Sequence, residues 1–475
     1  RSIDFDLNLN NNLSFESLIE KFYEIIYHSF SLFVPKTKMY NKYSLIWANA
    51  ELRDCIIKKK CAHKKFKLFP SDANYYDFSN LRKKCKHLIT ICHDQYISNI
   101  ENSIQTNIKP FWNYVNSLKK SNNSVPDCVN YNNSSSTNIS ETAQLFANYF
   151  SSVYTKDHPL FNGVVPLPSD VTNNYLNLCS WTIELNEIVD YLNSLNTHTG
   201  TGPDGIPPMF LKTCSSVLAR PLHMIFNKSL GLGYFPNIWK KSFVTPVHKS
   251  GDKHNVTNYR PISKMSIIPK MFEALITKKL SLIMSPLISN NQHGFRPKMS
   301  ISTNVLLFQE KIISALNQRV QLDTIYTDFQ KAFDKVNHKI LLYKLSCFGI
   351  HGTFFNWLKS YLYSRTQVVK INSYVSNDFL VSSGVPQGSH LGPLLFILFI
   401  NDLPSIFDSS VNILLFADDA KLFSVIKSPN DSLKLQSNLD KFVEWSRVNL
   451  LPLNINKCSV ITFSRINNII TYSYI

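Results

Sequence analysis

The chain has 475 residues, of which 44% are hydrophobic and 13% aromatic, so it can form several packed cores and is not a disordered chain. Its 50 Lys and Arg residues exceed its 33 Asp and Glu residues, and the net charge of +17 favours a polyanionic partner. The longest nearly apolar stretch runs only from Leu391 to Ile400. A membrane-spanning helix needs about 20 apolar residues, so we expect no membrane contact.

The chain carries no sign of secretion. Its first residues lack the basic and apolar regions of a signal peptide, and its nine cysteines are scattered and never spaced Cys-x-x-Cys. This cysteine pattern fits a reducing compartment, so we expect an intracellular protein. The first residue is Arg1 rather than Met, which suggests a fragment.

Residues 1–120 are predicted to form a mostly helical basic region. Apolar side chains recur at helical spacing from Phe15 to Ile26, and residues 51–120 hold eight more basic than acidic residues. Aromatic residues alternate with the lysine clusters, as in surfaces that stack on bases and contact phosphates. A solvated helical face explains the same charges equally well, so both interpretations stay open.

The segment before the C-terminal half divides into two parts. Residues 121–140 are rich in Asn and Ser without apolar periodicity, which predicts a flexible linker, and residues 141–227 are predicted to be helical. Within them, Gly200-Thr-Gly-Pro-Asp-Gly205 matches the spacing of a dinucleotide-binding fingerprint. That fingerprint follows a strand, whereas the pattern before Gly200 is helical, so we interpret the motif as a stiff loop.

Carboxylates stand at the ends of predicted strands. The β-prone stretch Ile325–Phe329 contains Asp328 and precedes a helical pattern over Lys331–Phe348. Two further β-prone runs, at 411–416 and 420–426, are joined across a short acidic turn as in a β-hairpin.

That turn holds Asp418 and Asp419 between apolar strands. Like charges in such a place are costly unless a cation neutralises them, and magnesium prefers carboxylate oxygens. If Asp328 lies beside Asp418, the carboxylates can hold two metal ions for phosphoryl transfer. Taken alone, the Asp pair is better explained as a polar hairpin tip.

Several further motifs occur in one order along the chain, and together they are highly specific. They are Gly202-Pro-Asp-Gly-Ile-Pro207, Asn258-Tyr-Arg-Pro-Ile-Ser263, Gln292-His-Gly-Phe-Arg-Pro297, Asp328-Phe-Gln-Lys-Ala-Phe-Asp334, Gly384-Val-Pro-Gln-Gly-Ser389, Leu391-Gly-Pro-Leu-Leu395, Phe416-Ala-Asp-Asp419 and Leu453-Asn-Ile-Asn-Lys457. From about Gly200 to Phe463, the sequence resembles the reverse transcriptases of jockey-like non-long-terminal-repeat retrotransposons.

The resemblance implies catalytic roles for four residues. Asp328 and Asp418 would be the main ligands of two magnesium ions, with Asp419 as a third, less directly coordinated carboxylate. Lys457 would protonate the leaving pyrophosphate as a general acid. A surface lysine after a strand is the ordinary alternative for Lys457.

The resemblance also implies binding roles. Cations in the fingers would contact the incoming triphosphate, an aromatic gate would exclude a ribose 2′-OH, and a Gly-containing turn would pack against the nucleotide. These substrate-binding residues would be Lys249, Arg260, Phe333, Gln387 and Gly388, and Arg296 would lie near the template. A basic surface, a core aromatic and a tight turn remain the structural alternatives.

The implied fold is α+β, a right-hand polymerase with palm and fingers. Residues 141–227 would be a helical extension of the fingers, residues 228–475 the fingers and palm, and the thumb would be largely absent. The implied partners are an RNA template, a DNA primer and deoxynucleoside triphosphates, in a nuclear or cytoplasmic ribonucleoprotein of open oligomeric state. Two alternatives remain: a truncated or decayed nucleic-acid-binding protein without polymerase activity, and another two-metal enzyme such as a nuclease.

Overall fold

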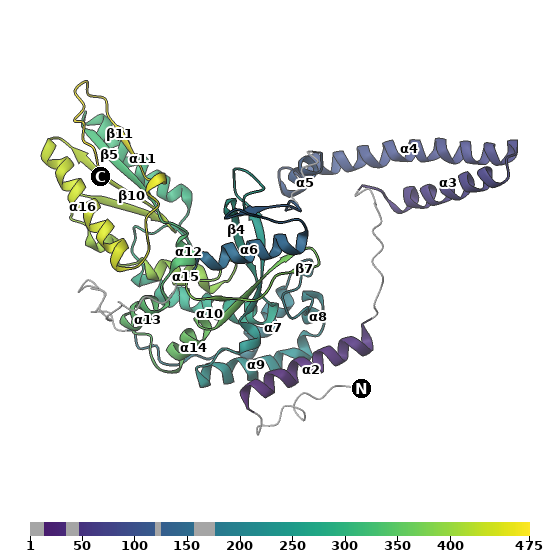
Figure 1. Cartoon of the computed structure of the whole chain (residues 1–475), viewed down its shortest axis with the longest axis horizontal. Coiled ribbons are helices and arrows are strands. Elements are labelled where there is room, and N and C mark those ends of the chain that lie inside the picture. Colours follow the sequence, from purple (N-terminus) through teal and green to yellow (C-terminus); the bar gives the residue numbers. More distant parts are fainter. Residues whose placement is uncertain (1–13, 35–46, 119–124, 156–175) are drawn as a thin grey trace. The chain divides into compact units, whose positions relative to one another are not determined.

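The computed structural model describes residues 14–34, 47–118, 125–155 and 176–475 (Figure 1). The chain divides into two compact units, and each is described by itself. One comprises residues 1–28 and 125–475, and the other comprises Ser29–Ser124.

The smaller unit contains a helical hairpin. Helix α3 (Ala50–Leu68) pairs with α4 (Asp72–Ser103), and α5 (Lys109–Leu118) follows. Asn49 caps α3 by accepting a hydrogen bond from the backbone N–H of Leu52, and Ser71 caps α4 in the same way. The seam between the two long helices buries a small core, whose members are Ala48, Leu52, Cys55, Cys85, Leu88 and Cys92.

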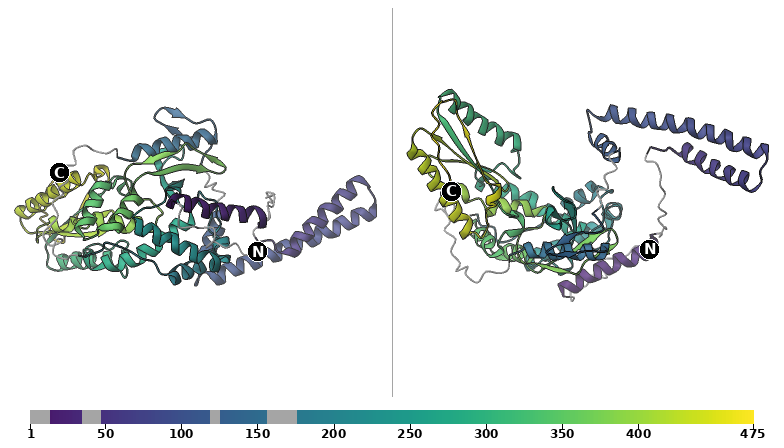
Figure 2. Two further views of the ribbon diagram at one scale, coloured as in Figure 1. Left: turned by 90° about the horizontal axis from the view of Figure 1, so that it is seen from below. Right: turned by 45° about the horizontal axis from the view of Figure 1, so that its top comes forward.

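In the larger unit, a four-stranded antiparallel sheet has the order β11-β5-β10-β9. Its strands are β5 (Gln321–Asp328), β9 (Asn412–Phe416), β10 (Asp419–Ile426) and β11 (Ser459–Phe463). Both the predicted strand that ends at Asp328 and the predicted β-hairpin are thereby confirmed. Phe308 of α11 (Ile301–Asn317) packs on one face of this sheet against Phe423, and α16 (Pro429–Val448) covers the other (Figure 1; Figure 2).

The larger unit also contains a second, five-stranded sheet. It contains β3 (Lys241–His248), β4 (Tyr259–Lys264), β6 (Arg365–Ile371), β7 (Tyr374–Val375) and β8 (Phe379–Val381). Helix α6 (Ile139–Val153) packs against it, where Phe146 and Phe150 join a core with Val244 and Val369.

The prediction of a flexible linker over residues 121–140 is wrong from Val125 onward. Residues 130–131 and 134–135 form the small hairpin β1–β2, and Val129 is fully buried beside Phe146. The buried hydroxyl of Ser136 accepts a hydrogen bond from the backbone N–H of Val129 at 2.8 Å. Asn and Ser satisfy this turn-rich backbone without apolar periodicity, so the pattern resembled a linker. Residues 121–124 lie outside the described residues.

Helices complete the larger unit, and aromatic side chains pack between them. The ring of Phe226 stacks on that of Phe272, with ring centroids 4.3 Å apart. Their bounds are α2 (Phe15–Phe33, of which residues 29–33 belong to the smaller unit), α7 (Leu185–Ser194), α8 (Pro208–Thr213), α9 (Ser215–Leu232), α10 (Ile267–Met284), α12 (Ala332–Lys335), α13 (His338–Cys347), α14 (Gly352–Leu362) and α15 (Leu391–Phe399). Short 3-10 turns lie at η2 (Asn237–Trp239), η3 (Val256–Asn258), η4 (Ser285–Leu287), η5 (Leu403–Ile406) and η6 (Ile455–Lys457).

Two local predictions can be compared with these helices. The helix predicted over Lys331–Phe348 is interrupted, because Asn337 adopts an extended conformation and caps α13 through the backbone N–H groups of Lys339 and Ile340. The stiff loop predicted at Gly200–Gly205 is confirmed, since it follows helix α7 rather than a strand. A Cβ on Gly202 would collide with the backbone of Ser266, so only glycine fits where the loop meets α10.

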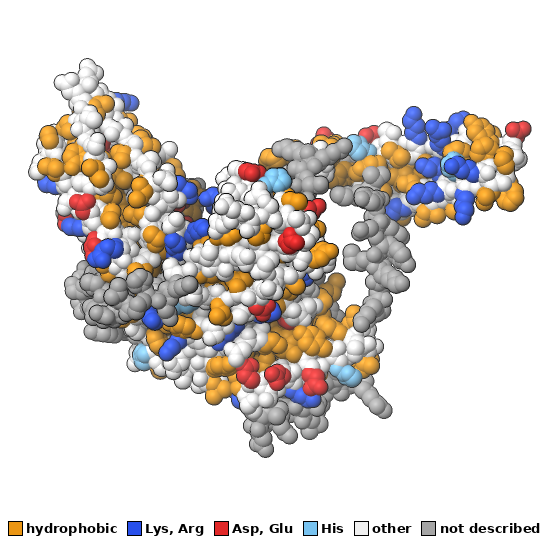
Figure 3. All heavy atoms as spheres, viewed as in Figure 1, with side chains coloured by type: hydrophobic (Ala, Val, Ile, Leu, Met, Phe, Trp, Pro, Cys, Tyr) orange, Lys and Arg blue, Asp and Glu red, His pale blue; other side chains and the backbone are white. Residues whose placement is uncertain are grey.

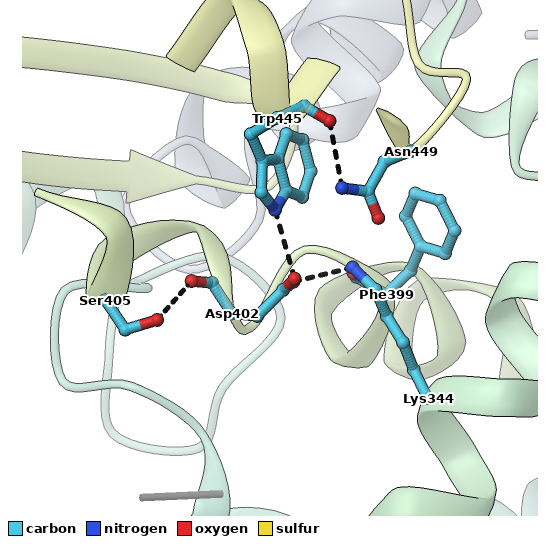
Figure 4. A network of polar contacts seen from close by, with 6 residues as sticks. All are labelled: Lys344, Phe399, Asp402, Ser405, Trp445 and Asn449. Carbon is cyan, nitrogen blue, oxygen red and sulfur yellow. Dashed lines mark hydrogen bonds and ion pairs between the residues drawn. The ribbon is translucent and has the colours of Figure 1, made fainter. Parts of the chain in front are cut away.

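A buried polar network fixes the helices beneath the first sheet (Figure 4). The Lys344 ammonium of α13 lies 2.6 Å from the Asp402 carboxylate and donates to the carbonyl oxygen of Phe399 at 2.7 Å. Trp445 of α16 donates its indole N–H to the other Asp402 oxygen at 3.0 Å. The charges are paired and hydrogen-bonded, which is the condition for burying an ion pair without a large cost.

Among the described residues, no helix is long and apolar enough to cross a membrane.

Candidate active site

Two carboxylates face each other across the first sheet. Asp328 is the last residue of β5, Asp419 is the first residue of β10, and the two are directly opposite in the antiparallel register. Side chains at opposite positions share one face of a sheet. Asp418 stands in the turn between β9 and β10, next to Ala417, whose φ of 54° is unusual for a residue other than glycine. The turn therefore holds a strained backbone beside the carboxylates.

A buried amide supports this turn. Gln292 accepts hydrogen bonds through Oε1 from the backbone N–H groups of Ala417, at 3.0 Å, and Gly294, at 2.7 Å. Its Nε2 donates to the carbonyl oxygen of Ala417 at 3.4 Å. Sequence reasoning assigned no role to Gln292, although it begins one of the recognised motifs. Its amide acts on the turn from a distant part of the chain, which no local pattern reveals.

Burial and mutual repulsion disfavour the charged carboxylates. Burial raises the pKa of Asp418, and the charges of Asp419 and Asp328 raise it further. The pKa of Asp419 is also raised, first by burial and then by Asp328. An additional cation would relieve this repulsion.

Lys457 supplies one positive charge at this place. Its ammonium lies 2.6 Å from Oδ2 of Asp328, and this hydrogen bond is the main cause of the raised pKa of Lys457. Asn454 donates its side-chain N–H to the same oxygen at 3.3 Å and its backbone N–H to the Asp328 carbonyl oxygen at 2.7 Å. The predicted general acid is thus adjacent to the predicted carboxylates.

Further cations approach from the second sheet. Lys249 follows β3, and Arg260 belongs to β4. The pKa of Lys249 is lowered, first by burial and then by the charges of Lys457 and Arg260. A basic wall therefore stands opposite the acidic turn.

These walls enclose a cavity of about 1470 Å³. Nine of the ten predicted site residues line it, namely Lys249, Arg260, Asp328, Phe333, Gln387, Gly388, Asp418, Asp419 and Lys457. The residues come from both sheets and from the segments that follow them, so the fold brings together groups that lie far apart in the sequence.

Phe333, Gln387 and Gly388 form another part of the cavity lining. Phe333 of α12 stacks on Phe396 of α15, with ring centroids 4.4 Å apart, so it is both a packed residue and a lining residue. Gln387 donates its amide N–H to Asp334 at 2.9 Å, and burial raises the pKa of Asp334 to about 6. Gly388 has φ +117°, and a Cβ there would collide with the carbonyl oxygen of Ser263. Only glycine allows this close backbone approach.

Arg296 is the predicted site residue that does not line the cavity. Its guanidinium donates to the backbone carbonyl oxygens of Ser289 at 2.7 Å, and of Gln292 and Ser285 at 3.4 Å each. The side chain thus fastens its own loop. Phe295 lines the cavity instead: it has φ 54°, is 54% exposed, and packs edge-on against Phe333 at 6.1 Å.

The carboxylates have the right donor chemistry for magnesium, which takes hard oxygen ligands. In the described part of the chain, however, no group of three or more His, Cys, Asp or Glu side chains is arranged to hold a metal ion. The ammonium of Lys457 occupies one oxygen of Asp328. Metal binding at Asp328, Asp418 and Asp419 therefore remains a prediction from their chemistry.

Comparisons with known proteins agree with the motifs. Residues 247–471 match the family described as reverse transcriptase (RNA-dependent DNA polymerase). In Drosophila melanogaster, one relative is the probable RNA-directed DNA polymerase from transposon X-element. The chain is 30% identical to it over 286 residues, which cover 58% of this chain and 31% of that protein. The corresponding protein from transposon BS is 30% identical over 339 residues, covering 68% and 37%. The RNA-directed DNA polymerase from mobile element jockey is 29% identical over 292 residues, covering 59% and 32%. The matched region spans about a third of each relative.

Proposed function

Because residues 247–471 make this chain a member of the reverse transcriptase family, related to the polymerases of non-LTR retrotransposons, we propose that it is an RNA-directed DNA polymerase acting in retrotransposition. One observation carries the proposal: Asp328 and Asp419 are cross-strand partners beside Asp418, in a cavity with a basic wall. The substrates are an RNA template, a DNA primer and deoxynucleoside triphosphates.

The acidic side of the cavity carries the chemical step. Asp328, Asp418 and Asp419 would hold two magnesium ions. Positive charge there would favour the ionised carboxylates, because the pKa values of Asp418 and Asp419 are raised first by burial and then by the neighbouring carboxylates. When bound, such ions would supply the activation of the primer 3′-hydroxyl and the stabilisation of charge on the leaving pyrophosphate. Gln292 holds the turn in place and is a positioning residue.

The basic wall binds the nucleotide. Arg260 and Lys249 contact the triphosphate, and Lys457 leaves Asp328 to give its proton to pyrophosphate. Phe333, held by Phe396, limits the space at the sugar 2′ position, and Gln387 with Gly388 supports the nucleotide. The sheet with β5 and β10 is the palm, and the sheet with β3 and β4, together with residues 141–227, belongs to the fingers.

Primer extension tests the proposal. The purified chain is given a primed RNA template, deoxynucleotides and magnesium, and is compared with Asp418→Ala plus Asp419→Ala. We expect incorporation in the parent chain and a loss of at least about a thousandfold in the variant, since the carboxylates act as a unit. Asp440→Ala plus Glu444→Ala removes two carboxylates from α16, outside the cavity lining, and is the matched control.

The folded state of the double variant is checked by its melting temperature. Removing two repelling carboxylates should leave stability equal or higher. The second candidate, a nucleic-acid-binding protein without polymerase activity, is favoured by the ion pair that already occupies Asp328. Template binding without incorporation by the parent chain, across a magnesium titration, would establish it and exclude the polymerase.

A further inference from the structure

The helical hairpin of the smaller unit has charged edges of two kinds. Four exposed basic residues of α3 are spaced so that helical geometry puts them on one face. They are Arg53, Lys60, Lys64 and Lys67. On α4, Arg82 and Lys86 are one turn apart and exposed. We call these six residues the cationic stripe: Arg53, Lys60, Lys64, Lys67, Arg82 and Lys86.

Contacts across the seam put both parts of the stripe on the same edge of the hairpin. His63 lies within one turn of Lys60 and Lys67, and its ring contacts Phe78 with centroids 4.7 Å apart. Phe78 lies one turn before Arg82 on α4. The cations of both helices therefore flank one side of the seam, and Figure 3 shows basic side chains spread over this hairpin.

Two ion pairs lie on the opposite edge. Lys84 of α4 pairs with Glu51 of α3 at 3.5 Å, and Lys58 pairs with Asp54 at 2.7 Å. Within the described residues, none of the stripe cations forms an ion pair. Acidic partners are thus present on the hairpin but gathered on one edge.

A solvated helix face does not explain this asymmetry. Lys60 with Lys64, and Arg82 with Lys86, are like charges at i,i+4, and such pairs destabilise a helix where a Glu–Lys pair would stabilise it. Lys67 lies 14 positions after Arg53, so the stripe extends about 21 Å along α3, which is enough to follow several phosphates. A polyanion bound along this edge would remove the repulsion.

Exposed rings lie close to the stripe in the sequence. Phe69, two residues after Lys67, is 67% exposed, and Tyr75, seven residues before Arg82, is 55% exposed. Rings on a basic surface stack on bases, but only on bases that are not enclosed in a duplex. The combination favours a single strand over a double helix.

We propose that the cationic stripe, with Phe69 and Tyr75, is a second nucleic-acid-binding site, which holds single-stranded RNA through its phosphates and unpaired bases. The choice of RNA rests on the proposed function, whose template is RNA. The residues of the site belong to the hairpin, and none of them lines the cavity that holds the carboxylates.

The test measures binding of a fluorescent, unstructured RNA to the full chain by anisotropy over a range of salt. The stripe variant is Lys60→Gln, Lys64→Gln and Lys67→Gln. The matched control is Lys58→Gln, Lys65→Gln and Lys84→Gln, which removes the same charge from exposed positions outside the stripe. We expect the stripe variant to bind roughly ten- to hundredfold more weakly at about 0.1 M salt, with a salt slope lower by about 2, and the control to change by less than about threefold. Equal weakening of both variants would overturn the site.

Footprinting separates the stripe from RNA bound in the cavity. Saturating RNA should protect Lys60, Lys64 and Lys67 from acetylation while Lys58 and Lys65 keep their reactivity, and unprotected stripe lysines would refute the proposal. Phe69→Ser plus Tyr75→Ser should weaken binding about tenfold without changing the salt slope. Unchanged affinity of this variant would rule out the two rings. Tighter binding of single-stranded DNA or duplex DNA of the same sequence would reject RNA as the ligand.

Primer extension at saturating template, run in parallel, keeps the two proposals distinguishable. The stripe variant should incorporate nucleotides like the parent chain once template is saturating. If neither incorporates but RNA still protects the stripe, the polymerase proposal fails and the RNA site stands. If both incorporate and the stripe variant binds RNA like the parent chain, the RNA site fails and the polymerase proposal stands.

Discussion

At the scale of single residues, the cavity combines groups that oppose each other energetically. Asp328 and Asp419 are opposite each other on neighbouring strands, and like charges at such positions destabilise a sheet. Lys457 offsets part of this cost through its 2.6 Å contact with Asp328. The left-handed backbone of Ala417 adds strain at the same turn. Strain and repulsion gathered at one place are typical of functional sites.

Phe295 is the cavity residue whose role is most open to test. Its left-handed backbone presents a half-exposed ring to the cavity, next to Phe333. We expect Phe295→Ala to raise the KM for primed RNA about tenfold with little change in kcat, because stacking on a template base is lost. Phe295→Tyr should restore the KM.

Steady-state primer extension with varied template measures both constants. Leu306→Ala, at an exposed apolar position on α11 outside the cavity lining, is the control and should behave like the parent chain. A KM for Phe295→Ala equal to that of the control would show that the ring does not contact the template.

Nine of the ten site residues predicted from the sequence line the cavity, but the sequence does not show how each is used. The motifs named nine residues that line one cavity, because their order along the chain is specific. Arg296 donates hydrogen bonds to three carbonyl oxygens and does not line the cavity, and its role at the template stays a prediction. Gln292 was overlooked, because hydrogen bonds between distant segments leave no periodic signal in the sequence. A polar side chain inside a motif was the only available sign.

At the scale of the helices and strands, α10 and α15 meet at a buried carboxyl. Glu273 of α10 is fully buried and accepts a hydrogen bond at 3.2 Å from the backbone N–H of His390, where α15 begins. Arg365 and Tyr361 face the same carboxyl. Burial raises the pKa of Glu273 from 4.5 to about 7, against the lowering effect of Arg365. The helix that follows Gln387 and Gly388 therefore starts at a titrating group.

This raised pKa predicts how stability depends on pH. Between about pH 4.5 and 7 the folded state holds a proton that the unfolded state has released, so the contribution of Glu273 is fully present below pH 4.5 and is lost as pH rises through 7. The loss amounts to roughly 3 kcal/mol of unfolding free energy. Glu273→Gln should remove this dependence, so that the variant gains stability relative to the parent chain as pH increases.

Urea unfolding at pH 5, 6, 7 and 8 measures the difference between the two proteins. Other buried acids, such as Asp334, titrate in both proteins and cancel in the difference. A difference that stays constant from pH 5 to 8 would contradict a titrating Glu273.

Elements with a clear local pattern of residue types were predictable from the sequence. Elements that depend on tertiary contacts were not. The strands around Asp328, Asp418 and Asp419 follow from runs of β-prone residues. The hairpin of residues 130–135 contains Asn and Ser, and its stability comes from Val129 packing under α6. Lys344 carries no sign in the sequence that it is buried, because its partner Asp402 lies 58 residues away. Tertiary burial overrides local preference at such positions.

At the scale of the whole molecule, the two compact units differ in how much apolar surface they bury. The hairpin core contains Ala48, Leu52, Cys55, Cys85, Leu88 and Cys92, whereas the larger unit buries many aromatic and aliphatic side chains. Stability scales with buried apolar surface, and small cores open at lower free energy. The division into units therefore predicts a division in stability.

Hydrogen exchange at increasing urea should reveal this difference. We expect the amides of α3 and α4 to exchange at lower urea than those of β5 and β10, because the hairpin opens without unfolding the sheets. Leu52→Ala removes a fully buried side chain from the hairpin core and should destabilise α3 and α4 by about 2–5 kcal/mol. Exchange of β5 and β10 should then be unchanged. Loss of protection in all four elements at one urea concentration would mean that the chain unfolds as a single unit. The hairpin that carries the cationic stripe would then not be an independently folding unit.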